Sequence, residues 1–162
     1  MKRNRKITDT TGAVIISSAS AVGGKEFEGP LGSCFDFHDP DDRFGQKTFE
    51  KSESEMQRLV LASAMSKSGL SPDDIGALFA GDLLNQCVSS AYGLLEYDIP
   101  YFGLYGACST CTEGLLIAAL MMEADPDTAR CAVVTSSHNS AAERQFRTPI
   151  EYGGQRNKSA QW

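Results

Sequence analysis

The chain has 162 residues, of which 41% are hydrophobic and 22% are charged, a composition typical of a globular protein that buries one core. Its net charge of −6 argues against a general nucleic-acid-binding surface. The longest uninterrupted apolar run, at residues 115–122, is eight residues long, whereas a bilayer requires roughly 20, so we predict no membrane span.

The five cysteines indicate a reducing compartment rather than a disulfide framework, because their number is odd and only Cys108 and Cys111 are closely spaced. Basic residues lie near the N-terminus at positions 2–6, but no apolar signal core follows them. These features predict a protein of cytoplasmic origin.

The first 48 residues contain little periodic pattern. Residues 1–11 are polar, and we expect them to be disordered. A β-branched run at residues 13–16 predicts a first strand. Residues 23–48 are rich in glycine, proline and aspartate, which predicts a long loop excursion of the kind that often carries function.

A helix is predicted over residues 52–69. Ser52 and Glu55 form a capping-box pattern at its start, and Gly69 is a suitable end. Its apolar face, at helical spacing, is predicted to comprise Met56, Leu59, Val60 and Ala64.

The rest of the chain alternates strands and helices. We predict strands at residues 75–80, 101–105 and 132–135, and helices at residues 85–97 and 109–124. Such alternation is typical of an α/β fold, here βαβαβαβ, with a mainly parallel sheet that helices cover.

The most informative segment is residues 106–115, which leads from a buried strand through a tight turn into the most apolar helix. Cys108 would lie beside the unpaired N–H groups and the positive end of that helix. Both favour a thiolate, so the turn predicts a nucleophilic cysteine or an anion pocket built from the same parts.

Other polar residues also follow predicted strands. Asp82, Cys108 and His138 each come after a strand, and ligands of parallel sheets gather beyond the carboxyl ends of the strands. Asp82 is also a candidate helix cap. Arg144 and Arg147 are three residues apart, so on one helical face they would form a clamp for a dicarboxylate.

Two readings of the cysteines compete with the pocket. Cys108-x-x-Cys111 in a strand-then-helix context is also the pattern of a thiol oxidoreductase. A zinc site would need Cys34 and His38 to converge with these two cysteines, and the spacing of Cys34 and His38 is unusual for zinc, so we predict no metal site.

Five blocks of sequence resemble the stage V sporulation protein AD family, within the thiolase-like superfamily. They are AGDLLNQ (80–86), GACST (106–110), TSSHN (135–139), AAERQFR (141–147) and EYGGQ (151–155). The resemblance runs from about residue 29 to residue 162 and implies a thiolase-like layered fold. It matches about the first half of a full-length family member, so we expect residues 1–162 to form an N-terminal half-domain and the C-terminal half to be absent.

The resemblance implies a function in sporulation. The family acts with the SpoVA proteins at the inner membrane of the spore, where we expect a peripheral location. It helps to move dipicolinic acid, as its calcium chelate, into the developing spore, and it is understood as a binding protein. Calcium would therefore enter as part of the ligand rather than as a resident cofactor, and a full-length member would be a homodimer.

The resemblance also assigns positions in this chain. The superfamily's nucleophile falls on Cys108, which would make the chain an acyltransferase working through a thioester. Thr110 and Cys111 stand where condensing enzymes place a glycine, which argues against an acyl tunnel, and the superfamily's remaining catalytic residues would lie beyond Trp162. The candidate ligand-binding residues are Cys108, Ser109, Asp82, His138, Arg144 and Arg147.

Overall fold

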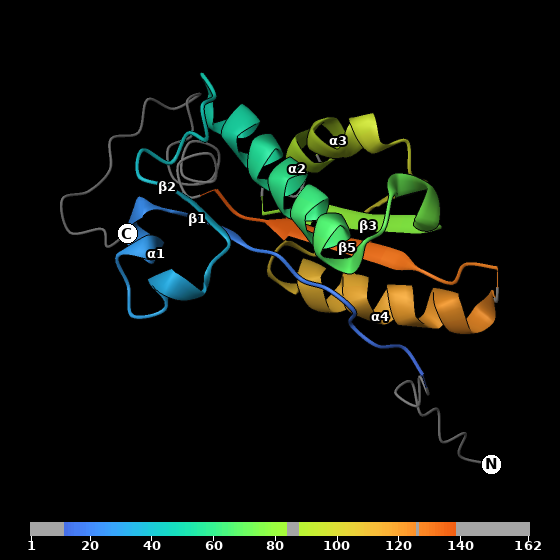
Figure 1. Cartoon of the computed structure of the whole chain (residues 1–162). Helices are drawn as coiled ribbons and strands as arrows, with labels where there is room; N and C mark the ends of the chain where they lie inside the picture. Colours follow the sequence, from blue (N-terminus) through green and yellow to red (C-terminus); the bar gives the residue numbers. More distant parts are fainter. Residues whose placement is uncertain (1–11, 84–87, 126, 139–162) are drawn as a thin grey trace, which may run out of the picture.

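A three-stranded parallel sheet forms the centre of the molecule in the computed structural model, which describes residues 12–83, 88–125 and 127–138 (Figure 1). Strand β3 (Ala77–Asp82) lies between β4 (Tyr101–Gly103) and β5 (Cys131–Ser136). Leu78 pairs with Tyr101 on one side and with Ala132 on the other. The predicted α/β class with a parallel sheet is confirmed.

Helices cover both faces of this sheet. Helices α2 (Phe49–Ser68) and α3 (Val88–Leu94) lie on one face, and α4 (Thr110–Ala124) lies on the other (Figure 1). Short 3₁₀ turns connect the elements: η1 (Gly32–Cys34), η2 (Pro72–Asp74), η3 (Leu95–Tyr97) and η4 (Ala107–Ser109).

The two hydrophobic clusters follow from the alternation of side chains along β3. Leu78 and Ala80 point toward α2 and α3, where they pack with Leu61 and Leu94. Ala77 and Phe79 point toward α4 and pack with Leu104 and Ala118. Because successive side chains of a strand point to opposite faces, one strand supplies both clusters. All six residues of β3 are buried.

Helix α2 begins earlier than predicted. Its N-cap is Thr48, which is extended and accepts a hydrogen bond from the Lys51 N–H at 3.3 Å. The predicted cap, Ser52, is instead a buried residue inside the helix whose hydroxyl donates to the Thr48 carbonyl. The predicted end is confirmed, because Gly69 adopts the left-handed conformation (φ 69°) that glycine favours.

The predicted strand at residues 13–16 is wrong. Val14, Ile15 and Ile16 are 74%, 74% and 61% exposed and form no strand. The first strand is β1 (Ala21–Gly23). A β-branched run becomes a strand only when a neighbouring strand pairs with it, and none does so within the described part of the chain.

The predicted loop excursion at residues 23–48 contains regular structure. It holds the short helix α1 (Gly24–Phe27) and strand β2 (Phe37–Asp39), which pairs in parallel with β1. Phe27 stacks on His38 with ring centroids 3.5 Å apart. The abundance of glycine and aspartate concealed these elements because each is only three or four residues long.

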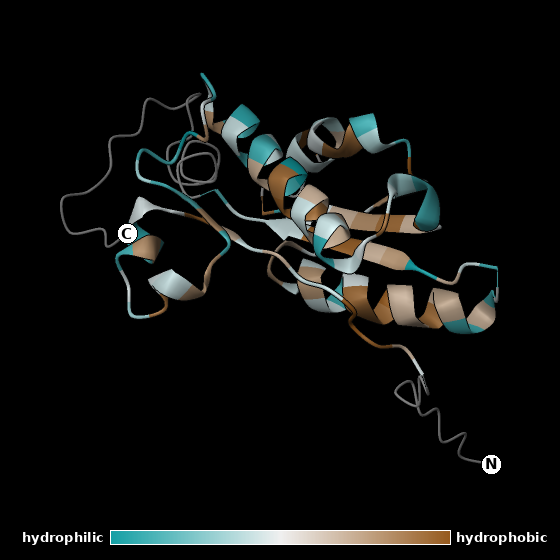
Figure 2. Cartoon of the chain, in the orientation of Figure 1, coloured by the Kyte–Doolittle hydropathy of each residue, from teal (hydrophilic) through white to brown (hydrophobic). Residues whose placement is uncertain are grey.

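The outer face of α4 is apolar and uncovered in the described structure. Leu115, Leu116 and Leu120 are 43%, 39% and 41% exposed, and the middle of the helix is hydrophobic, with hydrophilic residues toward its ends (Figure 2). The segment Ala107–Ala124 meets the length and composition of a membrane span, a criterion that the core helix of a soluble protein also meets. This face is suited to contact another apolar surface.

We therefore predict that the 162-residue chain self-associates. In sedimentation velocity at tens of micromolar, the chain should sediment faster than a monomer, because the exposed leucines of α4 leave water when two chains meet. The double substitution Leu115→Lys and Leu120→Lys should restore a monomer without unfolding the chain, since both side chains lie outside the buried core. A single sharp monomer boundary for the unsubstituted chain would contradict the prediction.

Candidate functional site

Three predicted site residues lie at the same edge of the sheet. Asp82 is the last residue of β3, His138 follows the end of β5, and Cys108 lies in the turn after β4. Because the three strands are parallel, their carboxyl ends share one edge. We call this edge, with the turn before α4, the rim.

The turn before α4 exposes its cysteine. Cys108 lies in η4 and is exposed, and the preceding Ala107 has a left-handed backbone (φ 49°). The Ser109 hydroxyl donates to the Gly106 carbonyl at 2.9 Å, so it closes the turn and does not cap the helix. The Ser109 side chain makes no capping hydrogen bond to α4; instead η4 runs directly into the helix, and the Thr110 N–H bonds to the Ala107 carbonyl.

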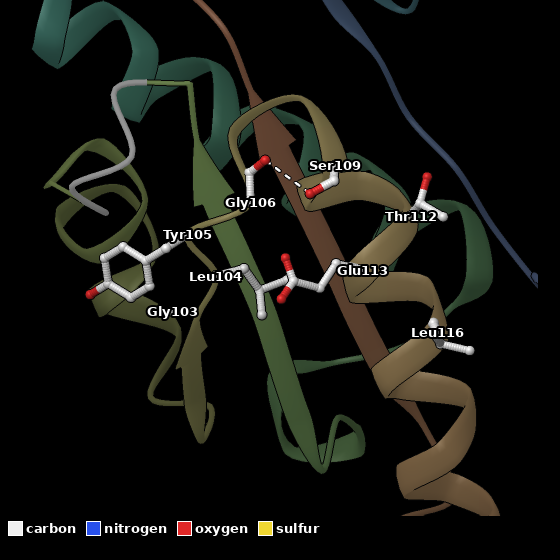
Figure 3. Close-up of a pocket in the computed structure, with 8 residues that line it drawn as sticks. All are labelled: Gly103, Leu104, Tyr105, Gly106, Ser109, Thr112, Glu113 and Leu116. Carbon is white, nitrogen blue, oxygen red and sulfur yellow. Dashed lines mark hydrogen bonds between the residues drawn. The ribbon is translucent and has the colours of Figure 1, made fainter. Parts of the chain in front are cut away.

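A pocket of about 610 Å³ lies between this turn, β4 and α4 (Figure 3). Its lining comprises Gly103, Leu104, Tyr105, Gly106, Ser109, Thr112, Glu113 and Leu116. Cys108 is not among these residues. Glu113 points from α4 toward the turn (Figure 3), and a Cβ on Gly106 would lie 2.5 Å from its Oε2. Glycine at 106 thus lets the carboxylate approach the backbone.

Asp82 is buried, does not line the pocket and fulfils one of its two expected roles, that of a helix cap. Its Oδ2 accepts hydrogen bonds from the Ser90 N–H at 3.4 Å and the Ser90 hydroxyl at 3.1 Å, both in the first turn of α3. It therefore helps to cap α3 from the rim. Its Oδ1 is buried and has no hydrogen-bond partner in the described structure.

Sequence analysis did not identify Glu53, which is buried behind the rim. Its Oε1 accepts a hydrogen bond from the Ser136 hydroxyl at 2.6 Å, and its Oε2 accepts one from the Ser89 hydroxyl at 3.3 Å. Burial raises the pKa of the Glu53 carboxyl, and the nearby charge of Asp82 raises it further, against the opposing effects of these hydroxyls and His138.

A signal for Glu53 was present in the sequence. Glu53, Gln57, Leu61 and Met65 recur every four residues, and all four are buried on the sheet-facing side of α2. The predicted apolar face lay one position to the side, on Met56 and Val60. The buried stripe was overlooked because it begins with two polar residues, Glu53 and Gln57. Gln57, which is buried in the same stripe, was missed in the same way.

His138 connects the rim to the segment before α2. Its Nε2 donates to the Asp42 carbonyl at 2.7 Å, and its ring lies 5.1 Å from that of Phe49. The ring is buried, and its Nδ1 has no partner in the described structure. The residue is thus held by structural contacts and keeps one unpaired nitrogen.

The remaining predicted site residues do not add to this geometry. Cys111 is an exposed free thiol on α4, as Cys108 is in the preceding turn. Arg144 and Arg147 lie outside the described residues. Within residues 12–83, 88–125 and 127–138, no three histidine, cysteine or acidic side chains are grouped so that they could hold a metal ion.

The fold and the rim together define an α/β protein whose candidate site lies at the carboxyl edge of a parallel sheet. The family model described as Stage V sporulation protein AD (SpoVAD) matches residues 3–162. Stage V sporulation protein AD of Bacillus subtilis (strain 168) is 42% identical over 144 residues, which cover 89% of this chain and 42% of that relative. The chain therefore belongs to the SpoVAD family of sporulation proteins, as its sequence blocks indicated, and it spans less than half of this relative's length.

The raised pKa of Glu53 predicts a specific dependence of stability on pH. A carboxyl whose pKa is higher in the folded state stabilises the fold fully below its unfolded value of 4.5, and this contribution is lost as the pH rises through the folded value. Relative to Glu53→Gln, the free energy of unfolding of the unsubstituted chain should fall by up to about 1.4 kcal/mol per pH unit in that interval. Urea titrations followed by circular dichroism at several pH values measure this difference; a constant difference would contradict it.

The cysteines should differ in their rates of alkylation. Cys34, Cys108 and Cys111 are exposed, whereas Cys131 is partly buried and desolvation raises the pKa of its thiol. With iodoacetamide at neutral pH, Cys131 should react about tenfold more slowly than the exposed three, because the thiolate is the reacting species. Peptide mapping by mass spectrometry gives the rates, and labelling in urea should make them equal. Fast labelling of Cys131 in the native chain would contradict the described burial.

Proposed function

We propose that this chain is part of a sporulation protein that binds dipicolinic acid, as the free acid or its calcium chelate, and helps to transport it into the developing spore. Membership of the SpoVAD family supports the role in sporulation. The start of α4, which lies beside the pocket, is the observation that carries the choice of ligand class.

The geometry suits an aromatic dicarboxylate in two respects. The positive end of the helix dipole at the start of α4 favours a carboxylate, which the Glu113 carboxylate in the pocket lining opposes. The pocket beside them is lined by the apolar Leu104 and Leu116 and by the ring of Tyr105, which suit a flat ring. Arg144 and Arg147 remain proposed partners for a second carboxylate, as a guanidinium binds a carboxylate through two parallel hydrogen bonds.

The proposed partners follow from the family and from the exposed surface. The protein would act with other SpoVA proteins, peripherally at the inner membrane of the spore, and a full-length member would be a homodimer. The exposed leucines of α4 support an apolar contact of this chain with further protein.

A second candidate function is acyl transfer through a thioester on Cys108. The exposure of this thiol at the start of a helix favours it, because a nucleophile there is accessible and the dipole stabilises its anion. Binding is preferred since Cys108 is not among the residues that line the pocket.

Calorimetric titration of the intact protein with dipicolinate tests the proposal. We expect saturable binding with one site per chain, and about tenfold weaker binding after the substitution Tyr105→Ala, which removes the aromatic wall of the pocket. The matched control is Tyr92→Ala on α3, because Tyr92 is 75% exposed and lies outside the pocket.

Absence of binding with and without calcium would contradict the proposal. Incubation with acyl-coenzyme A followed by intact-mass measurement distinguishes the second function: an acyl adduct that Cys108→Ser abolishes would establish acyl transfer instead.

A further inference from the structure

The Cys108-x-x-Cys111 motif lies beside the pocket, although neither cysteine lines it. Both thiols are free and exposed, Cys108 in η4 and Cys111 in the first turn of α4. The residues that directly follow them in the sequence, Ser109 and Thr112, do line the pocket (Figure 3). A change at the two sulfur atoms therefore acts on one wall of the pocket.

The backbone between the two cysteines has helical geometry. Ser109 (φ −88°, ψ −8°) and Thr110 (φ −51°, ψ −42°) both adopt the right-handed helical conformation. The Thr110 N–H bonds to the carbonyl of Ala107, three residues earlier, as in a 3₁₀ helix. Cys108 and Cys111 are therefore the first and fourth residues of one helical turn.

A disulfide fits across this turn. The first and fourth Cα atoms of a turn lie closer than about 7 Å, and disulfides span Cα separations of about 4.4–6.8 Å. In 3₁₀ geometry, side chains three residues apart eclipse one another, so the two thiols point the same way. Helical neighbours have Cβ atoms about 5–6 Å apart and a disulfide requires about 3.5–4.5 Å, so the turn has to tighten by roughly 1–2 Å.

The side chains that this tightening moves are exposed. Cys108, Ser109 and Thr112 are exposed, whereas Thr110 is buried and lies against β3, where a Cβ on Gly81 would be 2.8 Å from its Cγ2. Thr110 thus holds the turn to the sheet. A disulfide shifts Ser109 and Thr112 about this fixed residue and changes the wall that they give to the pocket.

We propose that Cys108 and Cys111 form a reversible disulfide with a low-molecular-weight disulfide as the oxidant, and that this bond weakens ligand binding in the adjacent pocket. Only the effect on the pocket rests on the proposed function. The odd number of cysteines and their spacing indicated a reducing compartment, and disulfides in such compartments are transient and redox-sensing. Exposed disulfides are the labile ones.

The exchange takes place in two steps. The Cys108 thiolate attacks one sulfur of the oxidant, which gives a mixed disulfide and releases one small thiolate. The Cys111 thiolate then attacks the Cys108 sulfur and releases the second. The protein loses two electrons to the oxidant, and the two protons of its thiols pass through solvent to the released thiolates.

Equilibration of the intact protein with oxidised glutathione, at a fixed concentration of reduced glutathione, tests the bond. After acid quenching, alkylation and peptide mapping, we expect the segment that holds Cys108 and Cys111 to have lost two hydrogens, to resist alkylation and to be restored by dithiothreitol. The bond should form at about tenfold less oxidised glutathione than the exposed Cys34 needs for glutathionylation, because the second thiol is already in place. Separate glutathione adducts on Cys108 and Cys111, to the same extent as on Cys34, would overturn the proposal.

Two variants assign the bond. Cys111→Ser should trap glutathione on Cys108, since the thiol that displaces it is gone. The matched control is Cys34→Ser, which removes an exposed thiol elsewhere and should leave the internal bond unchanged. Far-ultraviolet circular dichroism should be the same for the oxidised and reduced proteins. Loss of helical signal on oxidation would show that the folded turn does not accept the bond and would overturn the proposal.

Calorimetric titration with dipicolinate separates this inference from the proposed function. We expect about tenfold weaker binding by the oxidised protein, recovery with dithiothreitol, and the same change in Cys34→Ser. Equal affinities of the two redox forms would overturn the effect on the pocket while the proposed function stands. Absence of binding by both forms would overturn the proposed function, whereas the peptide map alone decides whether the disulfide forms.

Discussion

The burial of β3 on both faces is the constraint on which the rest of the structure depends. Because Leu78 and Phe79 point to opposite sides, α2 and α3 must cover one face and α4 the other. Parallel neighbours then bring three strand ends to one edge. The apolar packing of the strands therefore fixes where their ends lie. The side chains of the rim are placed by contacts in the core a few residues away.

The same packing explains why the polar side chains of α2 behind the rim are buried. Helix α2 places one stripe against the sheet, apolar at Leu61 and Met65 and polar at Glu53 and Gln57, where the strands end. Serines from α3 and β5 satisfy most of these groups. These hydroxyls do so without a buried ion pair among the described residues, and such a pair would require a cation with its own desolvation cost.

Local sequence patterns predicted the elements whose signals are strong over many residues. The turn before α4 and the burial of β3 are examples, because an apolar run bounded by glycine has few alternatives. The strand at 13–16 failed since pairing is a non-local property, and the cap at Ser52 failed because Thr48 competed for the same role. Glu53 was missed because the polar start of its four-residue stripe on α2 does not resemble an apolar face. Asp82 and His138 were found because they lie at or just beyond the ends of strands.

The hydrogen bond from His138 to the Asp42 carbonyl joins the segment after β5 to the segment after β2. Asp42 itself has a left-handed backbone (φ 61°), and its side chain accepts a hydrogen bond from the Gly24 N–H. Rearrangement of the segment that precedes α2 would thus be transmitted to the imidazole. Substitutions in this segment can therefore move a side chain at the rim without altering any residue that lines the pocket.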